Sequence, residues 1–248
     1  MEFLFWFILL ALLAEILGTV GGFGSSLFFV PIAGFFFDFH SVLGITALFH
    51  VSSNIAKITL FRKGFDKKLV FRIGIPAVLF VIAGAFLSKF FNSRLLEICL
   101  AVFLIAISSL LLIFKKLSIR PTLFNSVSGG ALSGLTAGLL GTGGAIRGLT
   151  LAAFNLEKNT FVATSAIIDL GIDLSRSVVY FSNGYMHRKD LYLVPILLGV
   201  SIAGTFIGKK ILNTFTQLQF RHAVLFLILT VGLLMFAKLL WPDIFPKF

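Results

Sequence analysis

The chain alternates between long apolar runs and short connectors that carry most of its charged residues. A helix needs about 20 predominantly apolar residues to cross the hydrocarbon core of a bilayer, and runs of roughly 18 or more are candidates. The clearest runs are Leu69 to Phe91, Leu95 to Phe114 and Ala223 to Leu240. The long helices predicted from this pattern cover about 41–61, 69–91, 95–114, 160–181, 190–211 and 221–240. The hydropathy pattern therefore predicts an all-α integral membrane protein.

Two further apolar segments are interrupted by glycines. The first pair of pieces covers about 3–17 and 25–37 around GTVGGFGSS, and the second covers about 124–140 and 146–155 around GTGGAIRG. At 1.5 Å per residue, the second piece of each pair reaches about half of a roughly 30 Å hydrocarbon core. Backbone that leaves a helix at this depth is tolerated only where it is buried or lines a cavity, and transporters use such broken helices to bind their substrates. The alternative is that the glycines let helices pack closely.

The two glycine-broken pairs belong to a predicted internal repeat. At an offset of 120 residues, glycines coincide at five places: Gly18/Gly138, Gly21/Gly141, Gly24/Gly144, Gly64/Gly184 and Gly84/Gly204. We therefore predict two repeated halves, 1–118 and 122–248, joined at KKLSIRPT, which together form one transporter domain. Each half would contain one glycine-broken helix pair and three longer transmembrane helices.

Charge does not decide how the two halves are oriented relative to each other. If each broken pair crosses the membrane once, the halves are parallel, and if each pair is a hairpin, they are inverted. In both arrangements eleven Lys and Arg residues fall on one side and six on the other, so both satisfy the positive-inside rule. The short second pieces fit a hairpin better.

Composition agrees with a lipid environment. Hydrophobic residues make up 58% of the chain and charged residues only 12%, with a mean hydropathy of +1.05, whereas soluble domains carry about 25% charged residues. The net charge of +11 comes mostly from connectors beside apolar runs. This placement marks cytoplasmic loops, with attraction to anionic lipid headgroups as the alternative. The expected partners are therefore the lipid bilayer and no nucleic acid, while assembly into a homo-oligomer stays open.

Two of the predicted long helices carry polar residues in the same spacing, i, i+4 and i+7, which places them on one helical face. They are His50, Asn54 and Lys57 in the first half and Asp169, Asp173 and Arg176 in the second, at an offset of 119. Ionisable residues within a membrane span are candidates for a functional site, because pairing or a water-filled cavity must offset their cost.

Two roles fit these polar stripes. In the first, the stripes are the walls of a substrate path in which Lys57, Arg147 and Arg176 attract an anion. Asp169 or Asp173 then exchanges a proton or neutralises an arginine. In the second role, self-neutralising pairs such as Asp173 with Arg176 hold the helices together.

Arg147 gives the strongest indication of an anion site. It follows the second glycine cluster and has no acidic residue within one helical turn. The helix that begins there presents free backbone N–H groups and the positive end of its dipole, so a further cation is unfavourable unless an anion joins it. Glu15, one turn before Gly18, is either a proton site or a paired acid. The candidate substrate-binding residues are Arg147, Gly21, Gly22, Gly24, Gly141, Gly143, Gly144, Lys57, His50, Asn54 and Arg176, and the candidate proton-coupling residues are Asp169, Asp173 and Glu15.

Other classes of function lack their motifs. GTVGGFG is only superficially like a phosphate-binding or dinucleotide-binding fingerprint, because no Gly-Lys-Ser/Thr follows it and no strand precedes it. His40, His187 and His222 show no metal-ligand spacing, and no Ser/His/Asp or Cys/His arrangement can be placed. We therefore expect no enzyme, no cofactor and no metal.

The stretch GTVGGFGSSLFFVP, from Gly18 to Pro31, resembles the glycine-cluster-then-proline signature of the TauE/SafE sulfite exporter family, also described as the sulfonate uptake permease family. The duplicated layout and the length are similar over essentially the whole chain. The second half departs from the signature, with Arg147 in its apolar stretch and Leu151 at the counterpart of Pro31.

This resemblance implies a permease of the bacterial-type cytoplasmic membrane, with several crossings and no ATPase of its own. Its expected substrates are sulfur-containing or organic anions such as sulfite and sulfonates. The resulting hypothesis is a secondary transporter for small anions, with proton coupling as a further hypothesis. The alternatives are a passive anion channel and a non-transporting membrane scaffold.

Overall fold

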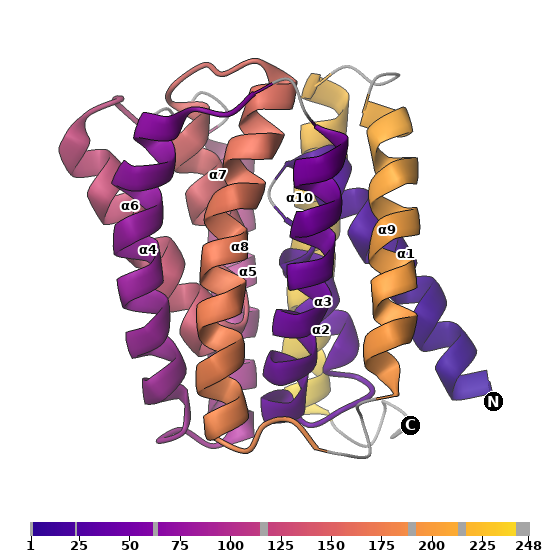
Figure 1. Ribbon diagram of the computed structural model, residues 1–248. Coiled ribbons are helices and arrows are strands. Elements are labelled where there is room, and N and C mark those ends of the chain that lie inside the picture. The colour runs from indigo at the N-terminus through magenta and orange to yellow at the C-terminus, as the bar shows by residue number, and fades with distance from the viewer. Residues whose placement is uncertain are drawn as a thin grey trace.

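The computed structural model describes residues 2–22, 24–61, 64–114, 119–187, 192–212 and 217–241, so part of the predicted joint at KKLSIRPT lies outside the described residues. Every regular element in these segments is a helix, which confirms the all-α prediction (Figure 1). The helices are α1 (Glu2–Gly21), α2 (Ser26–Ala33), α3 (Phe39–Leu60), α4 (Lys67–Ser88), α5 (Ser93–Ile113), α6 (Leu123–Leu140), α7 (Gly144–Ala152), α8 (Lys158–Ser182), α9 (Leu193–Leu212) and α10 (Gln217–Leu240).

Polar residues fix where four of the longer helices begin. Asp38, Asp66, Asn92 and Thr122 precede α3, α4, α5 and α6, and each side chain accepts a hydrogen bond from the backbone N–H three residues later. Such N-caps satisfy a donor that the first helical turn leaves without a partner. The apolar runs therefore become helices whose ends are set by the polar connectors.

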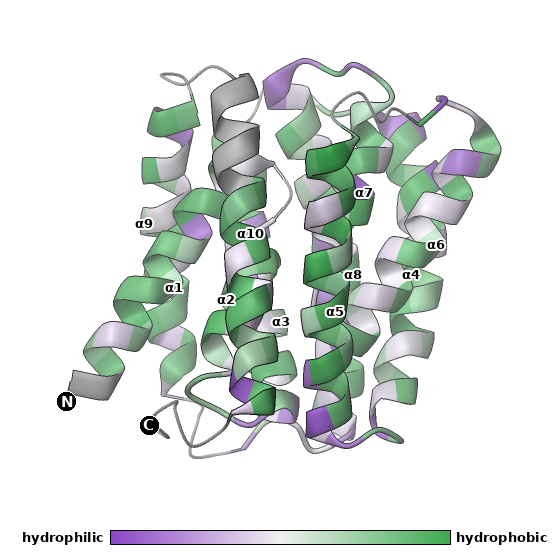
Figure 2. Cartoon of the chain, turned by 180° about the vertical axis from the view of Figure 1, so that it is seen from behind, coloured by the Kyte–Doolittle hydropathy of each residue, from purple (hydrophilic) through white to green (hydrophobic). Residues whose placement is uncertain are grey.

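Five of the described helices are long and apolar enough to cross a membrane: α1, α3, α4, α5 and α9. The 25-residue α8 is also long enough, but it carries Lys158, Asp169, Asp173 and Arg176. Hydrophobic residues predominate along α1, α5 and α10, while hydrophilic residues gather at the two ends of the bundle (Figure 2). Large apolar side chains such as Phe71, Leu79 and Phe181 are more than 60% exposed. Exposed apolar surface of this extent fits lipid rather than water.

The two short helices turn back towards the face from which the preceding helix came. We call the face that carries segments 64–66 and 153–157 the upper face, and the face that carries segments 34–38 and 183–187 the lower face, as drawn in Figure 1. Helix α1 begins at the lower face, and α2 leads back to it. Helix α6 begins at the upper face, and α7 leads back to that face. The two pairs therefore open towards opposite faces of the bundle.

Helices α3 and α8 pack against each other at the centre of the bundle. Around them, α1 packs on α9, α6 packs on α4, and α5 packs on α10. Helix α3 also contacts α9, and α8 also contacts α4. Most of the polar stripe residues of α3 and α8 are consequently buried.

Glycines let α6 and α4 approach each other backbone to backbone. Gly130, Gly134 and Gly138 share one face of α6, and a Cβ atom there would lie only 2.3, 2.1 and 2.4 Å from carbonyl oxygens of α4. Those oxygens belong to Ile73, Ala77 and Val81. Small residues at four-residue spacing are the usual means of close helix contact in membranes. These three glycines therefore serve helix packing.

A single methyl group on this face should destabilise the bundle. We expect Gly134→Ala to lower the thermal stability of the purified protein in detergent, because the new Cβ overlaps Ala77 O and overpacking costs about 1–3 kcal/mol. The matched control is Gly199→Ala in α9, where a Cβ would meet nothing within 4 Å. Since alanine favours helix over glycine, the control should be unchanged or slightly more stable. Equal behaviour of the two variants would contradict the packing described here.

Candidate functional site

The segments between α1 and α2 and between α6 and α7 contain glycines in conformations that other residues rarely adopt. Gly22 and Gly141 have φ values of +70° and +75°. Gly141 ends α6 in the left-handed conformation that is common just after a helix. The two segments meet where Ser26 Oγ lies 3.1 Å from Thr142 Oγ1, with both side chains buried. The ends of four helix pieces thus come together inside the bundle.

Three ion pairs are buried beside these segments, among the residues that the structure describes. They are Lys57 with Glu15, Arg147 with Asp169, and Arg176 with Asp173. Asp169 is the most exposed member, at 15% of its side chain, and the other five lie between 0% and 7%. Ions in such surroundings require a partner and further hydrogen bonds to offset the loss of water.

Glu15 is the most completely satisfied of the three acids. Its side chain is fully buried where α1 faces α3 and α9. The carboxylate contacts Lys57 Nζ at 2.8 Å and also accepts hydrogen bonds from the hydroxyl groups of Thr19, Ser25, Ser53 and Thr205. These groups join four parts of the chain, so Glu15 holds the first half of the site together.

Arg176 and Asp173 fasten α8 to the end of α6. Arg176 binds Asp173 Oδ1 through Nε at 2.8 Å and Nη2 at 2.6 Å, and Nη1 donates to Gly141 O at 2.8 Å and Ala137 O at 3.1 Å. The last carbonyl groups of a helix lack partners within the helix and carry partial negative charge, so a cation stabilises them. Asn54 of α3 donates to Asp173 Oδ2 at 2.7 Å. These contacts support the packing role rather than the substrate-binding role for this pair.

Arg147 lies in the first turns of α7 and is 2% exposed. Its Nη1 contacts Asp169 Oδ1, and its Nε donates to Ser165 Oγ at 3.0 Å. Its Nη2 has no hydrogen-bond partner among the described residues and lies near Gly24, where an added Cβ would be 3.5 Å away. The arginine therefore keeps one donor group for a ligand.

A small cavity lies between the α1–α2 segment, α3 and α8. Its volume is about 10 Å³, which is room for about one water molecule. The cavity is lined by Gly18, Thr19, Gly22, Gly24, Asn54, Lys57, Val162, Ser165, Ala166 and Asp169. A sulfite-sized anion does not fit in a space of this size, so binding requires the walls to move apart.

The structure brings together only part of the predicted site. Gly22, Gly24, Asn54, Lys57 and Asp169 line the cavity, and Arg147 borders it through Asp169. The remaining candidates are not among the lining residues: Gly21, His50, Gly141, Gly143, Gly144, Asp173, Arg176 and Glu15. His50 instead lies 3.2 Å from Ser25 Oγ through Nε2. Gly143 is packed so closely that a Cβ would lie 2.0 Å from Ser133 O.

Sequence reasoning missed two polar residues of this site. Ser165 lines the cavity and accepts from Arg147, and Thr19 lines it and donates to Glu15. Each lies four residues from a predicted site residue on the same helix, Asp169 and Glu15. Because residues at i and i+4 share a helical face, extending the polar stripes by one turn would have found both.

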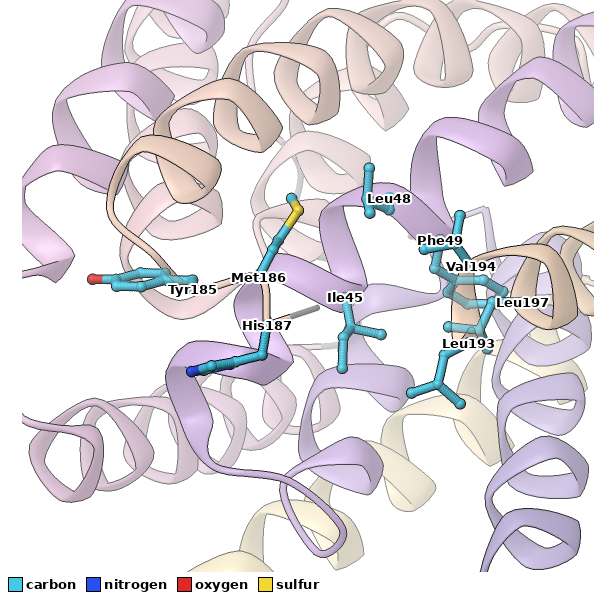
Figure 3. Close-up of a pocket in the computed structure, with 9 residues that line it drawn as sticks. All are labelled: Ile45, Leu48, Phe49, Tyr185, Met186, His187, Leu193, Val194 and Leu197. Carbon is cyan, nitrogen blue, oxygen red and sulfur yellow. The ribbon is translucent and has the colours of Figure 1, made fainter. Parts of the chain in front are cut away.

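A second cavity, of about 20 Å³, lies near the lower face between α3, α9 and the segment that follows α8 (Figure 3). Its walls are mostly apolar, with Ile45, Phe49, Met186 and Leu197 among them. An apolar lining does not suit a small anion. Of these two cavities, the one beside Arg147 is therefore the candidate functional site. Across the described residues, no group of three His, Cys, Asp or Glu side chains could hold a metal ion.

Apolar helices around buried, paired charges and a small internal cavity define a membrane protein of the transporter class. The family model Sulfite exporter TauE/SafE matches residues 7–235, so the chain belongs to this family. Members of the family are multi-pass membrane transporters and not enzymes, which places this chain in a membrane as a transporter or permease. Comparisons with the curated proteins and with the solved structures give no match.

The Glu15–Lys57 pair provides a test of how the buried charges are held. We expect Lys57→Met or Glu15→Gln alone to lower the free energy of unfolding by about 3–5 kcal/mol. Lys57→Met leaves the buried carboxylate of Glu15 without its counter-charge, and Glu15→Gln leaves the buried ammonium group of Lys57 without its counter-charge. The double variant Glu15→Gln/Lys57→Met should recover most of this loss. Denaturation of the four proteins gives the coupling energy of the pair, and simple addition of the two losses would contradict the pairing.

Proposed function

We propose that the chain is a secondary transporter for small sulfur-containing or organic anions such as sulfite and sulfonates. The observation that carries this proposal is the buried guanidinium of Arg147, which keeps Nη2 without a partner among the described residues at the edge of a polar cavity. Arginine presents several donors in a planar fork that matches oxyanions. Lys57 lines the same cavity and adds a second positive charge.

Two equivalent halves account for the way the helices pack. Exchanging α1–α5 with α6–α10 turns the α1–α9 contact into the α6–α4 contact, and the α3–α9 contact into the α8–α4 contact. The α3–α8 and α5–α10 contacts are unchanged by this exchange. The α1–α2 and α6–α7 pairs open towards opposite faces, which supports the proposal that the halves 1–118 and 122–248 are inverted copies. Inverted repeats with discontinuous helices allow a site to open alternately to the two sides.

The small size of the cavity supports transport by alternating access rather than passive flow through a channel. A channel needs a continuous water-filled path, whereas the space beside Arg147 holds about one water molecule. The Arg147–Asp169 ion pair can also break during such a movement, because the Asp169 carboxylate loses its charge when it takes up a proton. Proton coupling through Asp169 is therefore part of the proposal.

Charge on the two faces supports one orientation in the membrane. Of the described basic residues at the helix ends, six lie towards the upper face: Lys67, Lys68, Arg120, Lys158, Lys209 and Lys210. Three lie towards the lower face: Lys89, Arg94 and Lys238. Since positive charge accumulates on the cytoplasmic side, this distribution supports a cytoplasmic upper face.

Cysteine labelling tests this orientation with one Phe→Cys substitution on each face. In a Cys99→Ser background, which removes the chain's one cysteine, Phe65→Cys reports the upper face and Phe90→Cys the lower face. Both phenylalanines are exposed, at 44% and 73%. We expect a membrane-impermeant maleimide to label Phe90→Cys in intact cells and to label Phe65→Cys only after permeabilisation. The reverse pattern would place the upper face outside.

Anion flux into liposomes tests the proposed site. We expect Arg147→Ala to reduce the uptake of sulfite and sulfonates about tenfold or more, because a hydrogen bond to a charged group contributes about 1.5–3 kcal/mol. Arg94→Ala, which removes an exposed arginine of α5, is the matched control and should transport like the unchanged protein. Arg147→Ala/Asp169→Ala removes both charges of the pair, so its loss of flux cannot be caused by an unpaired aspartate. Normal flux in both Arg147 variants would contradict the proposal that Arg147 binds the anion.

A further inference from the structure

The buried charges at the centre of the bundle balance each other. Three acids stand against three bases: Glu15, Asp169 and Asp173, and Lys57, Arg147 and Arg176. The remaining titratable group at this level of α3 is His50, whose Nε2 lies 3.2 Å from Ser25 Oγ. A bound anion therefore adds one uncompensated negative charge to a buried site, unless a carboxylate takes up a proton.

The other helices around Asp169 add no charge to this balance. Helices α2 and α6 contain no charged residue, and Arg147 is the one charge of α7. Helix α4, which also packs on α8, has charged residues only in its exposed first two turns, at Lys67, Lys68 and Arg72. Apart from these and Lys158 at the start of α8, the charged side chains of α8 and of the helices that pack on it are thus Lys57, Arg147, Asp169, Asp173 and Arg176, with His50 as a further titratable group of α3.

Asp169 is the acid that is held by the fewest contacts. Its Oδ1 meets Nη1 of Arg147, which is its one hydrogen-bond contact among the described residues. Its side chain is 15% exposed and lines the cavity. It is also the acid nearest to Gly24, where an added Cβ would lie 3.9 Å from Oδ2. An anion that enters the cavity therefore reaches Asp169 and Arg147 together.

The other two acids are fixed more firmly. Glu15 is fully buried and is held by Lys57 and four hydroxyl groups. Asp173 is 3% exposed and is held by the amide of Asn54 and two nitrogens of Arg176. Neither carboxylate lines the cavity. Moving the carboxylate of Glu15 or Asp173 away from its partners would break several hydrogen bonds at once. Moving the carboxylate of Asp169 breaks only its contact with Arg147.

Building on the proposed function, we infer that the substrate is a singly charged anion that replaces the Asp169 carboxylate on Arg147, with one proton carried for each anion. The proton comes from water on the side to which the cavity opens, and it converts the carboxylate of Asp169 to a neutral carboxylic acid. The anion then accepts hydrogen bonds from Nη1 and Nη2 of Arg147. The loaded site has the same net charge as the empty one, so transport is electroneutral. A doubly charged anion would leave one charge uncompensated and is excluded.

Replacement of Asp169 by asparagine should uncouple anion transport from proton transport. Asparagine is close to the protonated aspartate in shape and cannot release a proton. In Asp169→Asn the empty site carries one additional positive charge, and an anion neutralises it without a proton. Each cycle then moves one negative charge across the membrane, so uptake should follow the membrane potential and ignore the pH gradient. Glu157→Gln, which removes an exposed acid immediately before α8, is the control and should remain driven by the pH gradient.

The experiment uses the full-length protein in liposomes, with sulfite in its singly charged hydrogen sulfite form, ethanesulfonate and ethane-1,2-disulfonate as probes. For the unchanged protein, an inward proton gradient of one pH unit should accumulate a transported monoanion about tenfold, and a potential set with valinomycin and K⁺ should have no effect. The disulfonate should not be taken up. For Asp169→Asn, an inside-positive potential of about 60 mV should give about tenfold accumulation, with no response to pH.

The outcomes separate this inference from the function on which it depends. Uptake by the unchanged protein that follows the potential, or that favours the disulfonate, would overturn the inference and leave anion transport standing. Uptake of none of the probes by the unchanged protein would overturn the proposed function as well. The measurements on the unchanged protein decide the stoichiometry even if a variant fails to fold.

Discussion

The whole structure depends on one electrostatic constraint, because charges that are buried in the membrane interior must neutralise each other. Six charged side chains meet this requirement in three pairs. One pair joins α1 to α3, one joins α7 to α8, and one lies within α8 and fastens it to the end of α6. The pairs therefore determine which helices stand at the centre. They also indicate which carboxylate can be released, since Asp169 is the one of the three acids that lines the cavity.

Glycines make this arrangement sterically feasible in two different ways. On α6, Gly130, Gly134 and Gly138 replace side chains with backbone contact, and α4 lies directly on them. In the segments between the short and long helices, Gly22 and Gly141 adopt positive φ values that permit the chain to turn. The first use holds the scaffold rigid, and the second brings helix ends and charges to the same place.

Much of the fold could be predicted from the sequence, because hydropathy and helix caps are local signals. The predicted helix over 95–114 becomes Ser93–Ile113, and that over 41–61 becomes Phe39–Leu60. The i, i+4, i+7 spacing also singled out Asn54 of α3 and Asp173 of α8, which are hydrogen-bonded to each other. It could not show that Glu15 lies against Lys57, 42 positions later, or that Arg176 contacts the end of α6. Periodicity gives the face of a helix, whereas the neighbour on that face depends on tertiary packing.

The central claim is that the helix ends and glycine segments create an anion site at Arg147. Its most direct test is anomalous diffraction at the selenium edge from crystals soaked with selenite, a close chemical analogue of sulfite, at low pH. The account predicts a selenium peak within hydrogen-bond distance of the Arg147 guanidinium, with the Asp169 side chain turned away from it. An ordered selenite elsewhere in the protein, with the Arg147–Asp169 contact intact, would contradict the account.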